Sequence, residues 1–337
     1  MVSNSSRVGG GNVPIKFIGM IAAAVCFAAS VAAGAQPVAK ISRIGVLWQT
    51  LPPPPINPNM ATLLKGLQDL GWQEGKTVAI EYRYGGNDAG RLAGFANELV
   101  RLRVDVITTA GDLSTRAAQQ ATSTIPIVAS VGFPVESGFV KSLSRPGGNI
   151  TGVAVIADEL SVKRLELLKE LVPRLSRVAV LWDPVTHERQ PRAVEAAALR
   201  LGLQVQVLHA KSASELEGAF DAAAAARAEA VLVLVSPMFT GNRAILVRLA
   251  AQHRLPAMYF NQAFIEAGGL IAYGPPIEEQ WGIVARAIDK ILKGARAAEL
   301  PVEQPTKFEL DINLKTARQI KVNVPQSILN RANRVIE

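Results

Sequence analysis

Polar side chains follow several apolar runs of the sequence at the point where each run ends. Asp183 closely follows the apolar run 178–181 and precedes Pro184. A carboxylate at this place either meets the ammonium or hydroxyl group of a ligand or caps an Asp-Pro turn. Asp112 has two similar interpretations, as a ligand contact or as the N-cap of a helix over 113–121. The chemistry predicted from these positions is therefore ligand binding by a few oriented polar groups.

The remaining candidates share this position behind an apolar run. They combine aromatic rings with hydroxyl and amide groups, as small-molecule sites do. The hydroxyls of Ser236 and Thr109 suit a ligand carboxylate, which free helix N-terminal amides also bind. Trp182 and Tyr259 have a second interpretation, in which they close the edge of a core and contact no ligand. The full set of predicted ligand-binding residues is Trp48, Gln49, Thr50, Thr109, Gly111, Asp112, Ser130, Gly132, Trp182, Asp183, Ser236, Met238, Tyr259, Asn261 and Tyr273.

The elements that position these residues are strand-like runs alternating with helix-like segments. Strands are expected at about 41–48, 77–84, 104–110, 125–131 and 150–156, and further strands begin near 177, 203, 230 and 256. This alternation predicts an α/β protein with parallel sheets that helices cover on both faces. Ligands bind beyond the carboxyl ends of such strands. The candidate residues are therefore expected around one cleft between two lobes.

The segment between the fourth and fifth expected strands contains two different patterns. Phe139, Val140 and Leu143 fit one face of a short helix. The turn-forming residues Arg-Pro-Gly-Gly-Asn at 145–149 exclude a regular element within that stretch. Breaker-rich segments of this kind also predict three crossings between the lobes, at about 150–156, 268–275 and 303–311.

Four blocks of sequence, at 142–152, 181–184, 266–275 and 300–310, resemble one family. This family comprises substrate-binding proteins of ABC importers and includes tryptophan- and tyrosine-binding lipoproteins. The resemblance covers about residues 41–337 and implies the type I periplasmic-binding fold, which has two doubly wound parallel-sheet lobes joined by three crossover segments. It also implies a small-molecule ligand, with an aromatic amino acid or a related compound as the first class to test. Phe133 stands where the family usually carries Asp, so an acidic residue near the cleft is missing.

The amino-terminal segment is predicted to be a secretion signal over residues 1–35. It carries two charges, then an apolar stretch, and the small-x-small sequence that ends at Ala35. Cleavage there directs the protein to the periplasm, whereas a retained anchor is the alternative. Val25 is a poor match for lipidation at Cys26, the only cysteine. The mature chain is expected to form lobe 1 from 36–153 and 270–305, and lobe 2 from 154–269 and 306–337.

Composition and motifs narrow the function classes. The formal charge of +8 is spread thinly and lacks basic runs with interleaved aromatics, which argues against nucleic-acid binding. No nucleotide-binding, metalloprotease or nucleophile-elbow motif occurs, so neither an enzyme nor a cofactor or metal site is predicted. The sequence predicts a monomeric solute-binding protein whose partners are a small molecule and an ABC-transporter permease. The alternative is a ligand-sensing protein of the same fold that acts on a signalling partner.

Overall fold

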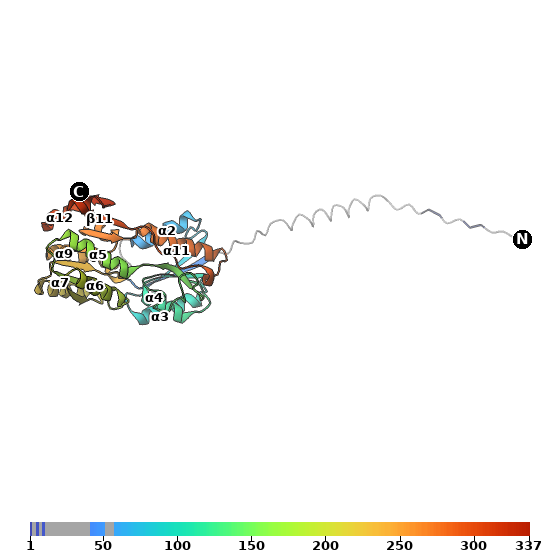
Figure 1. Ribbon diagram of the computed structural model, residues 1–337. Coiled ribbons are helices and arrows are strands. Elements are labelled where there is room, and N and C mark those ends of the chain that lie inside the picture. Colours follow the sequence, from blue (N-terminus) through green and yellow to red (C-terminus); the bar gives the residue numbers. More distant parts are fainter. Residues whose placement is uncertain (2–4, 7–8, 11–40, 51–56) are drawn as a thin grey trace. The chain divides into compact units, whose positions relative to one another are not determined.

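The computed structural model describes residues 1, 5–6, 9–10, 41–50 and 57–337 (Figure 1). Residues 42–337 form one unit, separate from the amino-terminal unit of residues 1–41. Cys26 and the expected cleavage site at Ala35 lie outside the described residues. Within the described part of the chain, no helix has the length and apolar character that crossing a membrane requires.

The first sheet contains five parallel strands in the order β2-β1-β3-β4-β5. β4 and β5 are buried at every residue because helices cover both faces of the sheet. One face packs against α2 and α11, and the other packs against α3 and α4. The elements are β1 (Ser42–Trp48), α2 (Pro58–Asp69), β2 (Val78–Tyr84), α3 (Ala89–Arg101), β3 (Val106–Ala110), α4 (Asp112–Ala121), β4 (Ile127–Val131), β5 (Ile150–Ala154) and α11 (Ile277–Leu292).

The second sheet contains seven strands in the order β12-β11-β10-β9-β8-β6-β7. Its part β7-β6-β8-β9-β10 repeats the strand order of the first sheet. The pair of β10 and β11 is antiparallel, whereas the other pairs of this sheet are parallel, in agreement with the predicted parallel-sheet lobes. The strands are β6 (Arg177–Trp182), β7 (Gln204–His209), β8 (Ala230–Val233), β9 (Ala257–Tyr259), β10 (Ile271–Gly274), β11 (Glu309–Asn313) and β12 (Arg334–Ile336).

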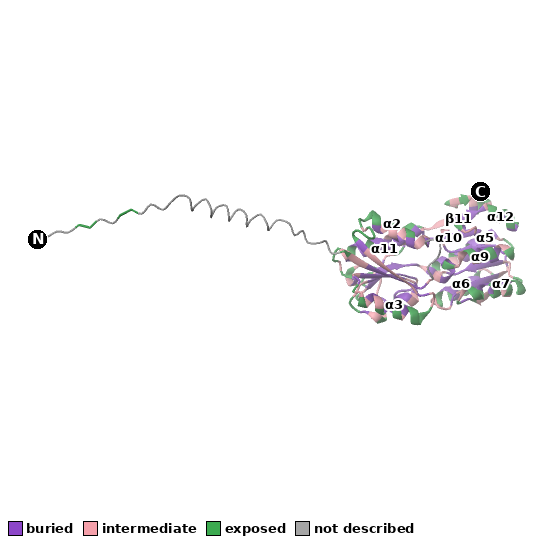
Figure 2. Ribbon diagram, turned by 180° about the vertical axis from the view of Figure 1, so that it is seen from behind, coloured by how far each residue is buried: buried purple, intermediate pink, exposed green. Residues whose placement is uncertain are grey.

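Helices also cover both faces of the second sheet, so that buried residues concentrate between the layers (Figure 2). Helices α5, α6, α12 and α13 pack on one face, and α7, α8, α9 and α10 pack on the other. Their bounds are α5 (Ala157–Leu171), α6 (Arg189–Arg200), α7 (Leu216–Ala225), α8 (Pro237–Gly241), α9 (Arg243–Gln252), α10 (Gln262–Glu266), α12 (Leu314–Ile320) and α13 (Gln326–Leu329).

The chain passes between the two lobes three times: from β5 to α5, from β10 to α11, and from residue 299 to β11. The expected division assigned residues 270–305 to the first lobe. Strand β10 pairs within the second sheet, so the second crossing comes after Gly274, and α11 is the element that returns to the first lobe. The third crossing lies beside the first, because Glu303 forms a parallel bridge with Val153.

The short helix expected around Phe139, Val140 and Leu143 does not form. The segment between β4 and β5 consists of turns and irregular backbone. Gly138 and Gly147 adopt positive φ values of 69° and 73°, which interrupt helical geometry on both sides. Phe139 and Val140 are nevertheless buried in the core below α3 and α4. The apolar pattern therefore identified core residues and misjudged their backbone.

Candidate functional site

A cavity of about 110 Å³ lies where the carboxyl ends of the strands of both lobes meet. In each sheet the strand order reverses at a switch point, between β1 and β3 in one lobe and between β6 and β8 in the other. Ligands of open α/β sheets bind at such switch points. The cavity wall consists of Trp48, Thr50, Asn57, Asn59, Ala110, Gly111, Asp112, Ser130, Val131, Gly132, Phe133, Val155, Ala157, Arg164, Thr186, His187, Gln190, Val235, Ser236, Pro237, Thr240, Phe260, Asn261, Pro275, Gln280 and Trp281.

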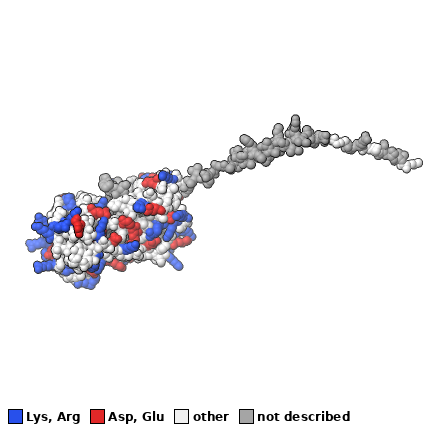
Figure 3. Space-filling model, turned by 90° about the horizontal axis from the view of Figure 1, so that it is seen from above, with Lys and Arg blue, Asp and Glu red and all other residues white. Residues whose placement is uncertain are grey.

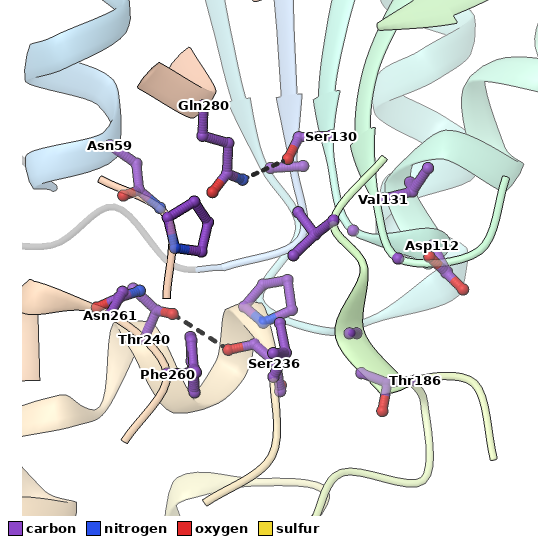
Figure 4. Close-up of a pocket in the computed structure, with 18 of the residues that line it drawn as sticks. Asn59, Asp112, Ser130, Val131, Thr186, Ser236, Thr240, Phe260, Asn261 and Gln280 are labelled. Carbon is purple, nitrogen blue, oxygen red and sulfur yellow. Dashed lines mark hydrogen bonds between the residues drawn. The ribbon is translucent and has the colours of Figure 1, made fainter. Parts of the chain in front are cut away.

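The first lobe contributes a pair of indole rings and a hydrogen-bonded hydroxyl. Trp48 ends β1 and Trp281 lies on α11, and their ring centroids are 4.9 Å apart. Both rings are buried in the core between α2, α11 and the sheet. Gln280 Nε2 donates a hydrogen bond of 2.8 Å to Ser130 Oγ, and the pair lies above Ser236 and Phe260 in the view of Figure 4. This wall offers a flat apolar surface beside oriented polar atoms.

The second lobe contributes a serine whose orientation is set by Asp183. Ser236 Oγ donates to Asp183 Oδ2 at 2.6 Å and accepts from Met238 N at 3.0 Å, so it is the N-cap of α8. Asp183 Oδ1 accepts from Val185 N at 3.1 Å. Burial raises the pKa of Asp183, although the hydrogen bonds from Ser236 and Val185 act in the opposite direction. Asp183 therefore stands behind the pocket wall and holds Ser236 in place.

The wall beside Asp112 is aromatic. The ring centroid of Phe133 lies 4.9 Å from that of His187. The guanidinium of Arg189 lies 5.3 Å from the same ring. Asp112 is partly buried, and burial raises the pKa of its carboxyl, while His187, Ser137 and Arg116 oppose this rise. Asp112 is the first residue of α4, whose N-cap is Gly111, so the predicted N-cap position is off by one residue.

Eight of the predicted residues lie in the cavity wall. They come from the ends of β1, β3 and β4 and from the starts of α8 and α10, where the rule for parallel sheets places ligand contacts. The eight residues are Trp48, Thr50, Gly111, Asp112, Ser130, Gly132, Ser236 and Asn261.

The other seven predicted residues lie outside the wall and have structural partners. Gln49 caps α4, since its Oε1 accepts from Leu113 N at 3.2 Å. Trp182 Nε1 donates to Thr186 Oγ1 at 3.0 Å. Each of the remaining five is held inside its lobe: Thr109 by Thr115, Asp183 by Ser236, Met238 and Tyr259 by the core on α7 and α9, and Tyr273 by Phe308.

Several wall residues were missed because they lie far from any strand end. Arg164 sits in the middle of α5, and Gln280 and Trp281 lie on α11, which follows a strand of the other lobe. Phe260 and His187 come from loops next to predicted positions. The sequence does contain a signal that could have identified Trp281 as a wall residue. Trp281 is the large aromatic residue of an amphipathic helix that directly follows the second crossing. Arg164 has no such signal, since α5 is rich in charged residues.

Two substitutions at Asp183 separate its charge from its hydrogen bonds. Asp183→Ala should cost about 1–3 kcal/mol of folding free energy, because Val185 N and Ser236 Oγ lose a buried acceptor. Asp183→Asn keeps an acceptor and should stay within about 1 kcal/mol of the parent at pH 7. Burial raises the pKa of Asp183 in the folded state, so the parent protein loses folding free energy as the pH rises and this carboxyl ionises. The asparagine of the variant does not titrate, so the stability of Asp183→Asn relative to the parent should increase between pH 4 and pH 7. Urea unfolding across this range measures both effects; equal stability of the Ala variant and the parent contradicts the assignment.

Comparison with known proteins agrees with this architecture. Residues 47–336 match the sequence profile of the family described as ABC transporter substrate binding protein. A tyrosine-binding protein of Clostridioides difficile (strain R20291) is 26% identical over 261 residues, covering 76% of this chain and 74% of the relative.

Two solved structures share the fold over 88% of this chain. A conserved domain protein from Vibrio cholerae superposes with a TM-score of 0.80 at 24% identity, over its whole length. An ABC domain from Streptococcus pneumoniae, solved in complex with L-Trp, gives 0.77 at 23% identity over 99% of its length. The two-lobed α/β architecture is the type I periplasmic-binding fold. The chain belongs to the family of ABC transporter substrate-binding proteins.

Proposed function

We propose that the protein is exported to the periplasm, captures a small molecule in the cleft between its lobes, and delivers it as a monomer to the permease of an ABC importer. The ligand is an aromatic amino acid or a related compound. The observation that carries this proposal is the cavity at both switch points, which combines the Trp48 and Trp281 rings with oriented groups such as Ser130. The relatives named for tyrosine and solved with L-Trp support the ligand class.

The role of a binding protein, and not of an enzyme, is supported by the family to which the chain belongs. The described residues contain no cluster of three or more metal-ligating side chains. On the face shown in Figure 3, basic and acidic side chains both occur, and a mixed face of this kind gives no support to nucleic-acid binding there. We propose the lobe division expected from the sequence, with the second boundary moved to follow Gly274.

The ligand class is tested by thermal unfolding of the mature chain with L-tyrosine, L-tryptophan and L-phenylalanine. A true ligand at about 1,000 times its Kd stabilises the fold by about 4 kcal/mol and raises Tm. Gly132→Leu should remove this rise without unfolding the protein, because a Cβ at Gly132 has no neighbour nearer than 3.7 Å and a longer chain fills the pocket. Gly148→Leu, where a Cβ meets nothing within 4 Å, is the control. No rise with any of the three compounds contradicts the proposed class.

Export is tested on protein recovered from the producing cell. Its amino-terminal sequence should begin at or near Gln36, because the small-x-small sequence ends at Ala35. A chain that begins at Met1 in the cytoplasm contradicts the proposal. A lipid on Cys26 shows a different processing route.

A further inference from the structure

Unpaired polar atoms concentrate at the pocket. Seven buried side-chain nitrogen or oxygen atoms have no hydrogen-bond partner among the described residues, and four of them belong to pocket-lining residues. These four are Trp48 Nε1, Thr50 Oγ1, Arg164 Nη2 and Trp281 Nε1. Two indole N–H groups and a guanidinium can only donate hydrogen bonds. A buried donor without an acceptor costs free energy, so a ligand with several hydrogen-bond acceptors would be stabilised in this pocket.

Arg164 carries the charge that this ligand must balance. The side chain is fully buried, its Nε donates to the Tyr273 carbonyl oxygen at 2.6 Å, and its Nη1 lies 3.5 Å from Ser161 Oγ. Among the described residues, no carboxylate forms an ion pair with it. Burial lowers the pKa of Arg164 to about 9. A buried cation is stable when an opposite charge compensates it, and here the cavity is the place from which that charge can come.

The acidic residue of the wall, Asp112, has partners within the protein. The charges that act on Asp112 belong to His187 and Arg116, and Ser137 Oγ donates to its Oδ2 at 3.4 Å. The carboxyl group of Asp112 therefore has a cationic neighbour within the protein, the guanidinium of Arg116. The positive charge of Arg164 has no ion-pair partner among the described residues.

The parallel architecture adds positive potential around the same cavity. Helices that follow parallel strands begin at the carboxyl ends of those strands, and α2, α4, α5, α6 and α11 all begin beside the pocket. A helix N-terminus carries about half a positive elementary charge. These termini do not define a binding position, but they favour the same sign of ligand charge as Arg164 does.

We propose that the ligand binds through a carboxylate anchored by Arg164, with its ring against Trp48 and Trp281, and that its ammonium group is dispensable. This inference rests on the proposed function and specifies the chemical class within it. The recognised molecule is an aromatic monocarboxylate, and an amino acid is one member of that class. Neutral groups such as Asn59, Asn261 and Gln280 line the pocket as well and suit a ring hydroxyl or ring nitrogen (Figure 4).

The test on the parent protein uses two series of three compounds measured by calorimetry. One series is L-tryptophan, indolepropionate and tryptamine, and the other is L-tyrosine, hydroxyphenylpropionate and tyramine. Within the series that binds, the amino acid and the desamino acid should have Kd values within about tenfold of each other, while the amine should bind at least about 100-fold more weakly. If the amine binds as well as the acid, the anchor is wrong although the proposed function stands. If neither series binds, both fail.

The variant test measures a ratio, so that general damage to the fold does not obscure it. Arg164→Gln should bring the affinity ratio of desamino acid to amine close to one, because the charge that distinguishes them is gone. Arg248→Gln is the matched control, since Arg248 is exposed on α9 and donates to Gln252 Oε1. An Arg164→Gln protein that keeps the parent's ratio overturns the proposal. Where this variant does not fold, the parent series still decides.

Discussion

Replacing Gly152 with alanine is expected to destabilise the folded protein by about 3 kcal/mol or more. Gly152 lies in β5 with a φ of 137°, and a Cβ built on it falls onto the Ala129 carbonyl oxygen and 2.6 Å from Ala129 N. Ala129 is its register partner on β4, so the two strands would have to separate. The Gly152 carbonyl oxygen also accepts a hydrogen bond of 2.9 Å from Glu303 N. A displacement of Gly152 would therefore also disturb the third crossing.

Gly148→Ala is the control in the same segment. A Cβ at Gly148 has nothing within 4 Å, and stability should stay within about 0.5 kcal/mol of the parent. Urea unfolding of both variants measures the difference. If Gly152→Ala is as stable as Gly148→Ala, β4 and β5 do not pair in this register.

The second large effect is expected at Trp281. Its side chain is 1% exposed and packs against Trp48, Ile277 and the core below α2. Trp281→Ala should therefore cost about 3–5 kcal/mol of folding free energy. Trp281→Phe keeps most of the ring surface but removes the unpaired indole N–H, and it should weaken ligand binding about tenfold.

Trp182→Phe provides the matched comparison. The indole N–H of Trp182 donates to Thr186 Oγ1, and its side chain lies outside the cavity wall. Calorimetry should show unchanged affinity for this variant. Equal losses for Trp182→Phe and Trp281→Phe indicate that both rings act through the fold and not through the ligand.

The strand positions could be predicted well because apolar runs of β-branched residues bounded by turn formers are local signals. The candidate site was predicted in the regions where the rule for parallel sheets applies directly, as at Trp48, Ser130 and Ser236. The rule that ligands bind beyond the carboxyl ends of parallel strands locates a ligand contact in the sequence to within about one residue. Neighbouring side chains in a strand point to opposite faces, so one step separates a wall residue from a core residue. Trp182 and Asp183 lie outside the cavity wall by this margin, next to wall residues such as Thr186 and Ser236.

The rest of the site depends on contacts between distant segments. Arg164 reaches the cavity from the middle of α5, and its Nε bond is to a carbonyl 109 residues away. Trp281 reaches it because α11 leaves one sheet and packs on the other. Neither fact follows from periodicity. The helix predicted near Phe139 does not form, because glycines with positive φ on both sides interrupt it. Its apolar pattern reflects burial in the core and not a helical backbone.

The three crossings are also bound to one another. Glu303 bridges Val153 across the first and third, and Glu279 at the start of α11 accepts from Thr306 N at 2.9 Å and from Lys307 N at 3.0 Å, which joins the second to the third. These contacts link the three crossings into one band. A rotation of the lobes about an axis through this band is the hinge motion that would leave these contacts intact. With such a hinge, the angle between the lobes is the quantity by which the proposed permease would distinguish a loaded protein from an empty one.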